Sequence, residues 1–299
     1  MTDSPARPSR WLARGLRCLP SNVVSRLAGR LARSRASRPL IMPFARAFQI
    51  VLHEAERDVL SYDTLNEFFT RRLRPDARPV DRAKGVIVSP VDGRVSAHGC
   101  CAAGRMLQVK GHDFDLLDLL LDPEMAEVFQ DGTFLTIYLS PHDYHRVHAP
   151  LDLDVFRVRH LKGALLPVNR PSVRFIPELY THNERVAVFA DSPLGRLAVI
   201  LVGAHCVGSI SLSFCDLITN QPRRADARID FDQAHLLRQG EELGMFELGS
   251  TVILLFEKGQ VELAELSSGD HVLMGQRIAA QAQASKSRKL RKKRSSPGP

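Results

Sequence analysis

Beyond residue 85 the chain is a succession of short apolar segments separated by turns, and this pattern limits its fold more than any other feature. The last of these segments, Val252–Phe256, has five consecutive apolar residues, which is typical of a strand buried on both faces. Segments of this kind with no long helix between them predict a β-rich core, an antiparallel sandwich or a barrel-like sheet. The expected strands cover residues 133–140, 154–161, 185–190, 196–214 as a pair, and 250–257.

The first 84 residues have a different, helical character, so the whole chain is expected to be α+β. Around residues 24–33, Val24, Leu27, Ala28 and Leu31 share one helical face, and arginines lie on the others. Such a helix suits a membrane interface, the surface of the core, or a transit peptide. A second helix is expected over "ARAFQIVLHEAERDVL" (45–60). We therefore predict a helical segment suited to a membrane surface (1–84), a β-rich core (85–277) and a disordered basic tail (278–299).

Charge is distributed unevenly along the 299 residues. Residues 1–46 carry ten Arg against one acid, and residues 286–294 carry seven basic residues and no acid. The net charge of +8 therefore arises from the two ends, and the chain between them is acidic. A nucleic-acid partner is not expected, because such a protein is usually basic across its fold. Two basic ends on an acidic body instead suit an anionic membrane surface.

Three histidines lie close together in "LSPHDYHRVHAP" (139–150), at His142, His145 and His148. Their spacing resembles a metal site, but in a strand the middle one would point to the opposite face. No Cys or carboxylate with ligand spacing accompanies them, and Asp143 completes no known pattern. We therefore expect no metal.

Asp92, His148 and Ser250 are candidates for a proton relay. Asp92 lies in the turn of "GVIVSPVDGRVSAHG", which predicts a strand, a turn and a strand, and Ser250 follows Gly249 directly before the last strand. A carboxylate can hold an imidazole that takes the proton of a serine hydroxyl. A nucleophile elbow of the G-x-S-x-G kind is not present at Ser250. An ordinary turn aspartate and an ordinary loop-to-strand junction remain alternatives.

Eight ordered blocks of the sequence resemble bacterial phosphatidylserine decarboxylase proenzymes. The Leu-Gly-Ser-Thr block and the histidine-rich block carry most of the resemblance, and together the blocks span about residues 60 to 277. They are "FFTRRLRPDARPV" (68–80), "SPVDGRV" (89–95), "VKGHDFDLLDLL" (109–120), "YLSPHDYHRVHAP" (138–150), "GALLPVN" (163–169), "NERVAV" (183–188), "LVGAHCVGSI" (201–210) and "GEELGMFELGSTVILLF" (240–256).

The resemblance implies that the chain cleaves itself between Gly249 and Ser250. Ser250 would become a covalent pyruvoyl group, the pyruvate cofactor, which forms a Schiff base with the substrate amine. Cleavage would leave a β chain (1–249) and an α chain (250–299) as a heterodimer, with a dimer of these left open. The resemblance implies that His148 is the base for Ser250, with Asp92 as its orienting carboxylate. It assigns His145 to the decarboxylation step, and it implies no requirement for His142.

The substrate implied by the resemblance is the membrane phospholipid phosphatidylserine, converted to phosphatidylethanolamine and CO₂. This implies a peripheral protein at the cytoplasmic face of a bacterial inner membrane, with a mitochondrial inner membrane as the alternative. Two other functions stay open: a pyruvoyl-dependent decarboxylase of a soluble amino acid, and a non-catalytic lipid-binding relative.

Overall fold

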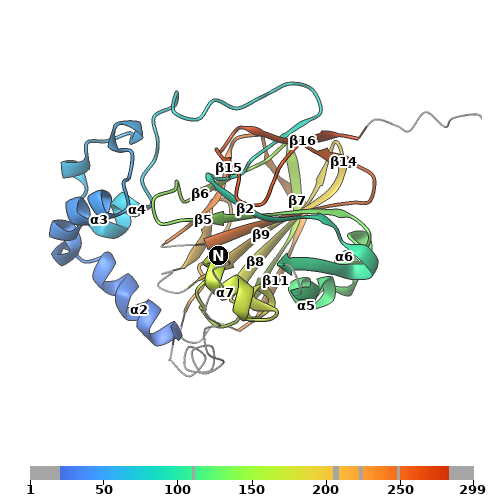
Figure 1. Ribbon diagram of the computed structural model, residues 1–299, viewed down its shortest axis with the longest axis horizontal. Coiled ribbons are helices and arrows are strands. Elements are labelled where there is room, and N and C mark those ends of the chain that lie inside the picture. Colours follow the sequence, from blue (N-terminus) through green and yellow to red (C-terminus); the bar gives the residue numbers. More distant parts are fainter. Residues whose placement is uncertain (1–20, 110–111, 205–208, 222–224, 248–249, 283–299) are drawn as a thin grey trace, which may run out of the picture.

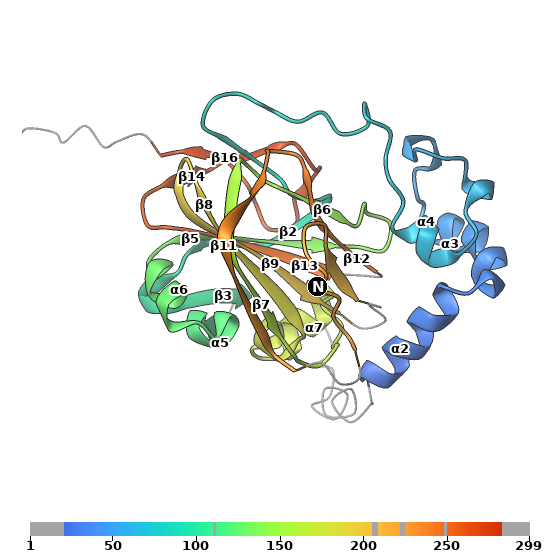
Figure 2. The same ribbon diagram turned by 180° about the vertical axis from the view of Figure 1, so that it is seen from behind.

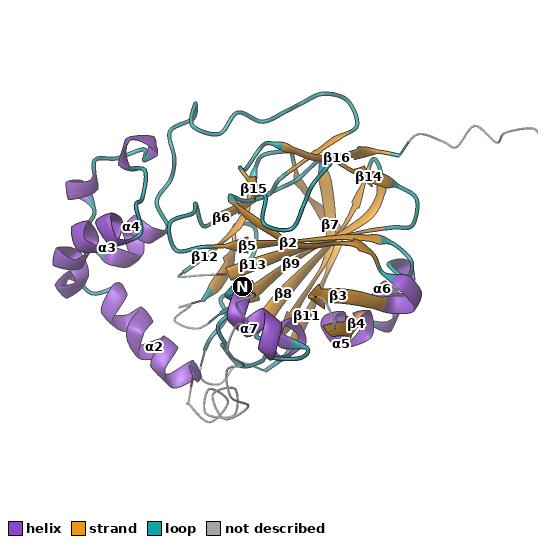
Figure 3. Cartoon of the chain, in the orientation of Figure 1, coloured by secondary structure: helices purple, strands orange, loops and turns teal. Residues whose placement is uncertain are grey.

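The computed structural model describes residues 21–109, 112–204, 209–221, 225–247 and 250–282. The described chain consists mostly of antiparallel strands with few helices (Figure 3). Gly249 and almost all of the predicted tail lie outside the described residues. No helix in the described ranges is long and apolar enough to cross a bilayer.

An eight-stranded antiparallel sheet forms the centre of the molecule (Figure 1). Its edge strands, β11 and β15, do not pair with each other in the described part of the chain, so the sheet is open. The barrel-like form of the sequence prediction is therefore wrong, whereas the antiparallel β-rich core is confirmed. In spatial order the strands are β11 (Ala227–Leu237), β7 (Leu153–Leu161), β8 (Arg185–Ser192), β9 (Gly195–Gly203), β13 (Ser250–Phe256), β5 (Thr133–Leu139), β2 (Gly93–Cys100) and β15 (His271–Val272).

Strand β13 lies in the middle of this sheet, between β9 and β5, and all seven of its residues are buried. Its side chains alternate between two hydrophobic cores, with Val252 and Leu254 in the first and Ile253 and Leu255 in the second. The uninterrupted apolar run follows from this position, because a strand covered on both faces has no solvent side. The predicted strand at 250–257 is confirmed.

The first core lies between one face of the large sheet and two three-stranded antiparallel sheets. Sheet therefore packs on sheet across this core. The predicted turn at Asp92 separates β1 from β2, which enter different sheets. The two small sheets are β1 (Val86–Val88), β16 (Arg277–Gln281) and β14 (Val261–Leu263), and β10 (Ile210–Leu212), β12 (Glu242–Phe246) and β6 (Arg146–His148).

Short helices and a two-stranded sheet cover the other face of the large sheet (Figures 1 and 2). The second core lies beneath them and includes Phe114, Phe129 and Tyr180. The covering elements are η4 (Ala102–Gly104), β3 (Arg105–Val109), β4 (His112–Asp115), α5 (Leu116–Leu120), α6 (Pro123–Val128), α7 (Arg170–Phe175) and α8 (Leu179–His182).

The N-terminal helices gather at one side of the β body, and a long loop leads from them to β1 (Figures 1 and 2). The single helix predicted over 45–60 is wrong, because the chain there breaks into one short helix and two 3₁₀ turns. Phe68 and Ile41 belong to a small separate core that holds these pieces together. The elements are α2 (Ser21–Ala32), η1 (Arg35–Leu40), α3 (Ile41–Ala47), η2 (Leu52–Glu54), η3 (Val59–Ser61) and α4 (Leu65–Phe69).

Helix α2 turns its small residues toward the protein and its leucines outward. Ser25 and Ala32 are buried, whereas Leu27 is 58% and Leu31 is 55% exposed. The side chain of Val24 lies outside the described part. The interpretation in which Leu27 and Leu31 pack on the core is therefore wrong.

The structured core continues past the expected boundary at residue 277. Strand β16 covers Arg277–Gln281, and Ile278 is fully buried in the first core. The strand was not expected because its apolar run, Ile278–Ala280, is only three residues long.

Candidate active site

Ser250 is the first residue of β13 and is fully buried. It pairs with Leu139 on β5 and Gly203 on β9. Since side chains alternate along a strand, the Ser250 side chain lies on the same face as Val252, the face of the first core. Its Oγ has no hydrogen-bond partner among the described residues. A buried hydroxyl without a partner costs about 1–3 kcal/mol, so its retention points to a chemical role.

His145, immediately before β6, is fully buried against the N-terminal segment. Its Nδ1–H donates to the carbonyl oxygen of Asp143 over 2.8 Å, and its ring lies 4.0 Å from that of Phe69 between centroids. This hydrogen bond fixes the tautomer in which Nε2 is an acceptor, and Nε2 has no partner among the described residues. Burial, with a smaller contribution from the Arg71 guanidinium, lowers the pKa of His145 to about 3. His145 is therefore a neutral imidazole whose Nε2 lone pair meets no donor in the part of the chain that the structure describes.

His148, at the end of β6, is also held in one tautomer. Its Nδ1–H donates to the carbonyl oxygen of Gly240 over 2.8 Å, and its Nε2 accepts from the Tyr144 hydroxyl over 3.1 Å. Burial lowers the pKa of His148, so this imidazole is neutral as well. Both ring nitrogens of His148 therefore already have a hydrogen-bond partner, and neither partner is Asp92.

Asp92 is paired with an arginine and does not hold His148. Its carboxylate accepts from Arg78 Nη2 at 2.6 Å and from Arg78 Nε at 2.9 and 3.0 Å, and Met274 N–H donates to it over 2.8 Å. The predicted direct contact from Asp92 to His148 is therefore not formed in this geometry. The backbones are nonetheless adjacent, since His148 N–H donates to Pro90 O over 2.8 Å.

A cavity of about 220 Å³ lies between Asp92 and the N-terminal segment. Asp92 and Tyr144 line it, so the hydroxyl that contacts His148 belongs to a cavity residue. Residues 49–78 contribute part of the lining, so the N-terminal segment and the β body both border the cavity. The lining residues are Gln49, Val51, Glu54, Arg71, Arg78, Asp92, His142, Asp143, Tyr144, His271 and Leu273.

Arg71 is an unusual member of this lining, because its guanidinium is buried without a carboxylate. The residue is 4% exposed, and its Nε and Nη1 have no partner among the described residues. Nη2 contacts His142 O at 3.4 Å, and the group lies over the Phe68 ring. Burial lowers the pKa of Arg71, because the charged guanidinium has lost its water. An anion bound beside it would compensate for that loss.

Sequence reasoning missed Arg71, Arg78 and Tyr144. Arg71 and Arg78 lie in the block "FFTRRLRPDARPV", and Tyr144 lies between His142 and His145. Their presence in the resembling blocks was the available signal, but no local pattern shows that an arginine 14 residues upstream pairs with Asp92.

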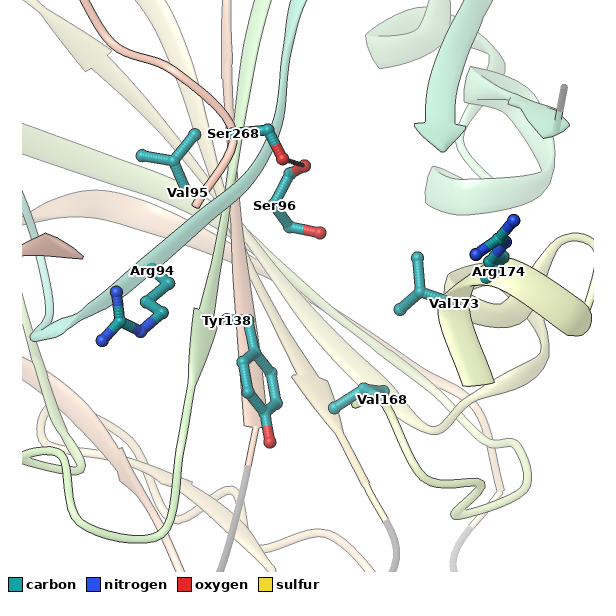
Figure 4. A pocket seen from close by; sticks show the side chains of 8 residues that line it. All are labelled: Arg94, Val95, Ser96, Tyr138, Val168, Val173, Arg174 and Ser268. Carbon is teal, nitrogen blue, oxygen red and sulfur yellow. Dashed lines mark hydrogen bonds between the residues drawn. The ribbon is translucent and has the colours of Figure 1, made fainter. Parts of the chain in front are cut away.

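A second cavity, of about 250 Å³, lies on the face of the large sheet that the second core covers. Figure 4 shows the side chains that line it. Tyr138 lines it and packs with the second core, whereas its neighbour Leu139 belongs to the first. Figure 4 also shows Ser268, which donates to Ser96 O over 2.9 Å, and Arg174 at the far side. Because strand alternation directs Ser250 to the other face, this cavity does not belong to the site.

The fold and the site together define a class of protein: an antiparallel β protein whose central sheet buries a serine hydroxyl with no partner in the described ranges, with two neutral imidazoles close to a cavity. The sequence matches the family model of Phosphatidylserine decarboxylase over residues 65–280. This match covers more than half of the chain, and the chain belongs to that family.

Curated relatives agree with this assignment. A phosphatidylserine decarboxylase proenzyme of Pseudomonas putida is 44% identical over 276 residues, which cover 89% of this chain and 96% of the relative. A proenzyme of the same name from Acidovorax ebreus is 44% identical over 82% of this chain and 88% of its own length. Another from an Anaeromyxobacter species is 43% identical over 89% of this chain and 97% of its own length.

Proposed function

We propose that this chain is a phosphatidylserine decarboxylase that makes its own pyruvoyl group by cleavage between Gly249 and Ser250. The observation that carries the proposal is the Ser250 hydroxyl, which is buried at the start of the central strand with no hydrogen-bond partner among the described residues, in a chain whose relatives are named proenzymes. That hydroxyl fits a residue that is consumed in making the group. A serine with a permanent structural role would normally be hydrogen-bonded.

Self-cleavage begins with attack of Ser250 Oγ on the Gly249 carbonyl carbon, which replaces the amide by an ester. The Oγ proton needs an acceptor, since serine is a poor nucleophile until it is deprotonated. His148 is our choice for this base: its Nδ1–H is fixed on Gly240 O, and its Nε2 lone pair is available once the Tyr144 hydroxyl turns away. Elimination then frees the Gly249 carboxylate, and hydrolysis releases ammonia from residue 250.

Once formed, the pyruvoyl carbonyl supplies the electron sink that loss of CO₂ requires. The residues of this chain bind and orient the lipid headgroup and manage protons. The buried Arg71 guanidinium has two nitrogens without a partner among the described residues, so it suits an anionic group of the headgroup. His145 has a free Nε2 close to Arg71, and we assign it to proton handling in the decarboxylation step.

The two histidine roles make different predictions for single variants. His148→Ala should leave a single chain, because the Ser250 proton has no acceptor. His145→Ala should still give two chains but should decarboxylate phosphatidylserine at least 100-fold more slowly, the usual contribution of a positioned acid or base. Denaturing mass spectrometry and a CO₂ release assay separate these outcomes. Two chains from His148→Ala together with one chain from His145→Ala would reverse the assignment.

We further propose that the protein is peripheral, on the cytoplasmic face of a bacterial inner membrane, with its N-terminal helices against the lipid. Val51 lines the cavity and is 44% exposed, and Leu27, Leu31 and Phe48 of the same segment are also exposed. Exposed apolar residues near a cavity mouth give a route from the bilayer to the site. Basic residues at the two ends of the chain add attraction to anionic lipid.

The decisive test begins with the denatured mass of the purified protein. Two chains, 1–249 and 250–299, with the smaller lighter by one ammonia than a serine-started peptide, would support the cleavage. A single chain of 33.3 kDa would refute it. Activity on phosphatidylserine in vesicles and none on free serine would support the lipid substrate. The reverse preference would favour a decarboxylase of a soluble amino acid.

A further inference from the structure

We propose that His142, Asp143 and His271 form a binding site for a divalent metal ion of the zinc class at the edge of the cavity. The sequence led us to expect no metal, because the three histidines near residue 145 had no carboxylate partner. In the structure only one of those histidines, His142, belongs to the group. The Asp143 carboxylate contacts both His142 and His271, and His271 lies 128 positions further along the chain than Asp143. His145 and His148 point elsewhere and are hydrogen-bonded to Asp143 O and Gly240 O.

The geometry of the three ligand atoms fits a tetrahedral ion. His142 Nε2 and His271 Nε2 each lie 3.3 Å from Asp143 Oδ1, and all three atoms lie within 4.8 Å of one another. Zinc binds imidazole nitrogen and carboxylate oxygen at about 2.0–2.2 Å, so neighbouring ligands of a tetrahedral ion are about 3.4 Å apart. As direct N–H···O hydrogen bonds, the same two contacts would be long, since charge-assisted bonds are about 2.7–2.9 Å.

Asp143 has the surroundings of a ligating carboxylate. Its side chain is 2% exposed, and its only ion-pair partners among the described residues are the two imidazoles. Its other oxygen, Oδ2, accepts from Ser140 N–H over 2.7 Å, which fixes the carboxylate as an outer-shell bond does in metal sites. A buried carboxylate is normally matched by a cation, and none of the arginines of the cavity fills that role.

The carboxylates that line the cavity outnumber the guanidiniums by one, so a bound cation would offset a net negative charge. Arg78 is matched by Asp92 and Glu54, and Arg71 has no carboxylate partner among the described residues. Counting these four groups with Asp143 gives three carboxylates and two guanidiniums lining the same space. The side chains of His142 and His271 are 40% and 37% exposed, so an ion can enter from solvent and keep a water or a substrate oxygen as its fourth ligand.

The site has two consequences for the neighbouring chemistry. Asp143 O receives the Nδ1–H of His145, so an ion that fixes Asp143 also fixes the orientation of that imidazole. If the chain cleaves itself as proposed, His142 and Asp143 belong to the β chain and His271 to the α chain. The ion would then join the two products of cleavage, and this consequence rests on the proposed function.

The test is zinc binding by calorimetry on the full-length Ser250→Ala variant after chelator treatment, which measures the site whether or not the chain can cleave. We expect zinc to bind, and we expect His271→Ala and His142→Ala, each added to that variant, to weaken the binding at least tenfold. His182→Ala, which removes an exposed histidine of α8, is the matched control and should bind as the parent does. Cobalt(II) absorption in the visible provides a second readout, since the intense bands of a tetrahedral ion should be lost with His271.

Equal zinc affinity in the parent and in folded His271→Ala would overturn the proposal, as would a parent that takes up no zinc at millimolar concentration. His271→Gln keeps an amide that can hydrogen-bond to Asp143 but is a poor zinc ligand. It therefore decides the question if His271→Ala does not fold. Because cleavage is read separately from the mass spectrum of the wild type, failure here leaves the decarboxylase proposal untouched.

Discussion

Removing the Arg78 guanidinium should lower the free energy of unfolding strongly. Removing the guanidinium of an equally short ion pair on the surface should hardly change it. Arg78 Nη2 lies 2.6 Å from Asp92 Oδ2, and the two side chains are 8% and 4% exposed. In the Arg78→Met variant the apolar stem keeps its packing, but the Asp92 carboxylate stays buried with only the Met274 N–H to stabilise it. Leaving one charge of a buried pair alone costs about 3–5 kcal/mol.

The matched control is Arg105→Met. Arg105 Nε also lies 2.6 Å from a carboxylate, that of Asp113, but both side chains are 51% exposed. Water solvates these charges whether or not they are paired, so the control should leave stability almost unchanged. Urea unfolding of both variants in the single-chain Ser250→Ala background gives the comparison without dissociation of two chains.

The double variant Arg78→Met/Asp92→Asn protects the test against a protein that fails to fold. It removes the buried Asp92 charge together with its partner and leaves only Glu54, which is 28% exposed, without its arginine. It should therefore recover most of the stability lost in Arg78→Met. Similar urea midpoints for Arg78→Met and Arg105→Met would refute the reasoning. A double variant no more stable than Arg78→Met would show that Arg78 acts through its packing and not through Asp92.

Three further predictions concern the substrate, pH and the membrane. Arg71→Met should raise the KM for phosphatidylserine at least tenfold while the denatured mass still shows two chains, and Arg71→Lys should recover part of the loss. An unfolded histidine takes a proton below about pH 6.5, whereas folded His145 stays neutral down to about pH 3, so acid favours the unfolded chain. The free energy of unfolding should therefore fall by up to about 1.4 kcal/mol per pH unit for this one proton in that window. In urea unfolding of the single-chain background, His145→Asn should make the decline shallower, and an unchanged slope would contradict it. The double variant Leu27→Ser/Leu31→Ser should lower the fraction of protein that co-sediments with anionic vesicles. It should not alter thermal stability, because both side chains already face solvent.

The sequence by itself determined the main strands and the place of Ser250 at the start of the central one. Residues 250–256 form a fully buried strand, as their continuous apolar run predicted, because a strand covered on both faces must be apolar throughout. Local patterns failed where packing competes with propensity. Residues 45–60 have helical composition, but the chain breaks to place Glu54 beside Arg78 and Val51 at the cavity.

Only the tertiary structure decided how the charged and polar side chains are partnered. Asp92 and His148 were predicted to touch, but Arg78 takes the carboxylate while Gly240 and Tyr144 take the imidazole. The histidines at 142, 145 and 148 looked like one group in the sequence, yet the fold joins His142 to His271 and buries the other two. The physical reason is that apolar periodicity is a local property of the chain. A hydrogen bond or an ion pair instead depends on a few tenths of an ångström between residues that only the folded chain brings together.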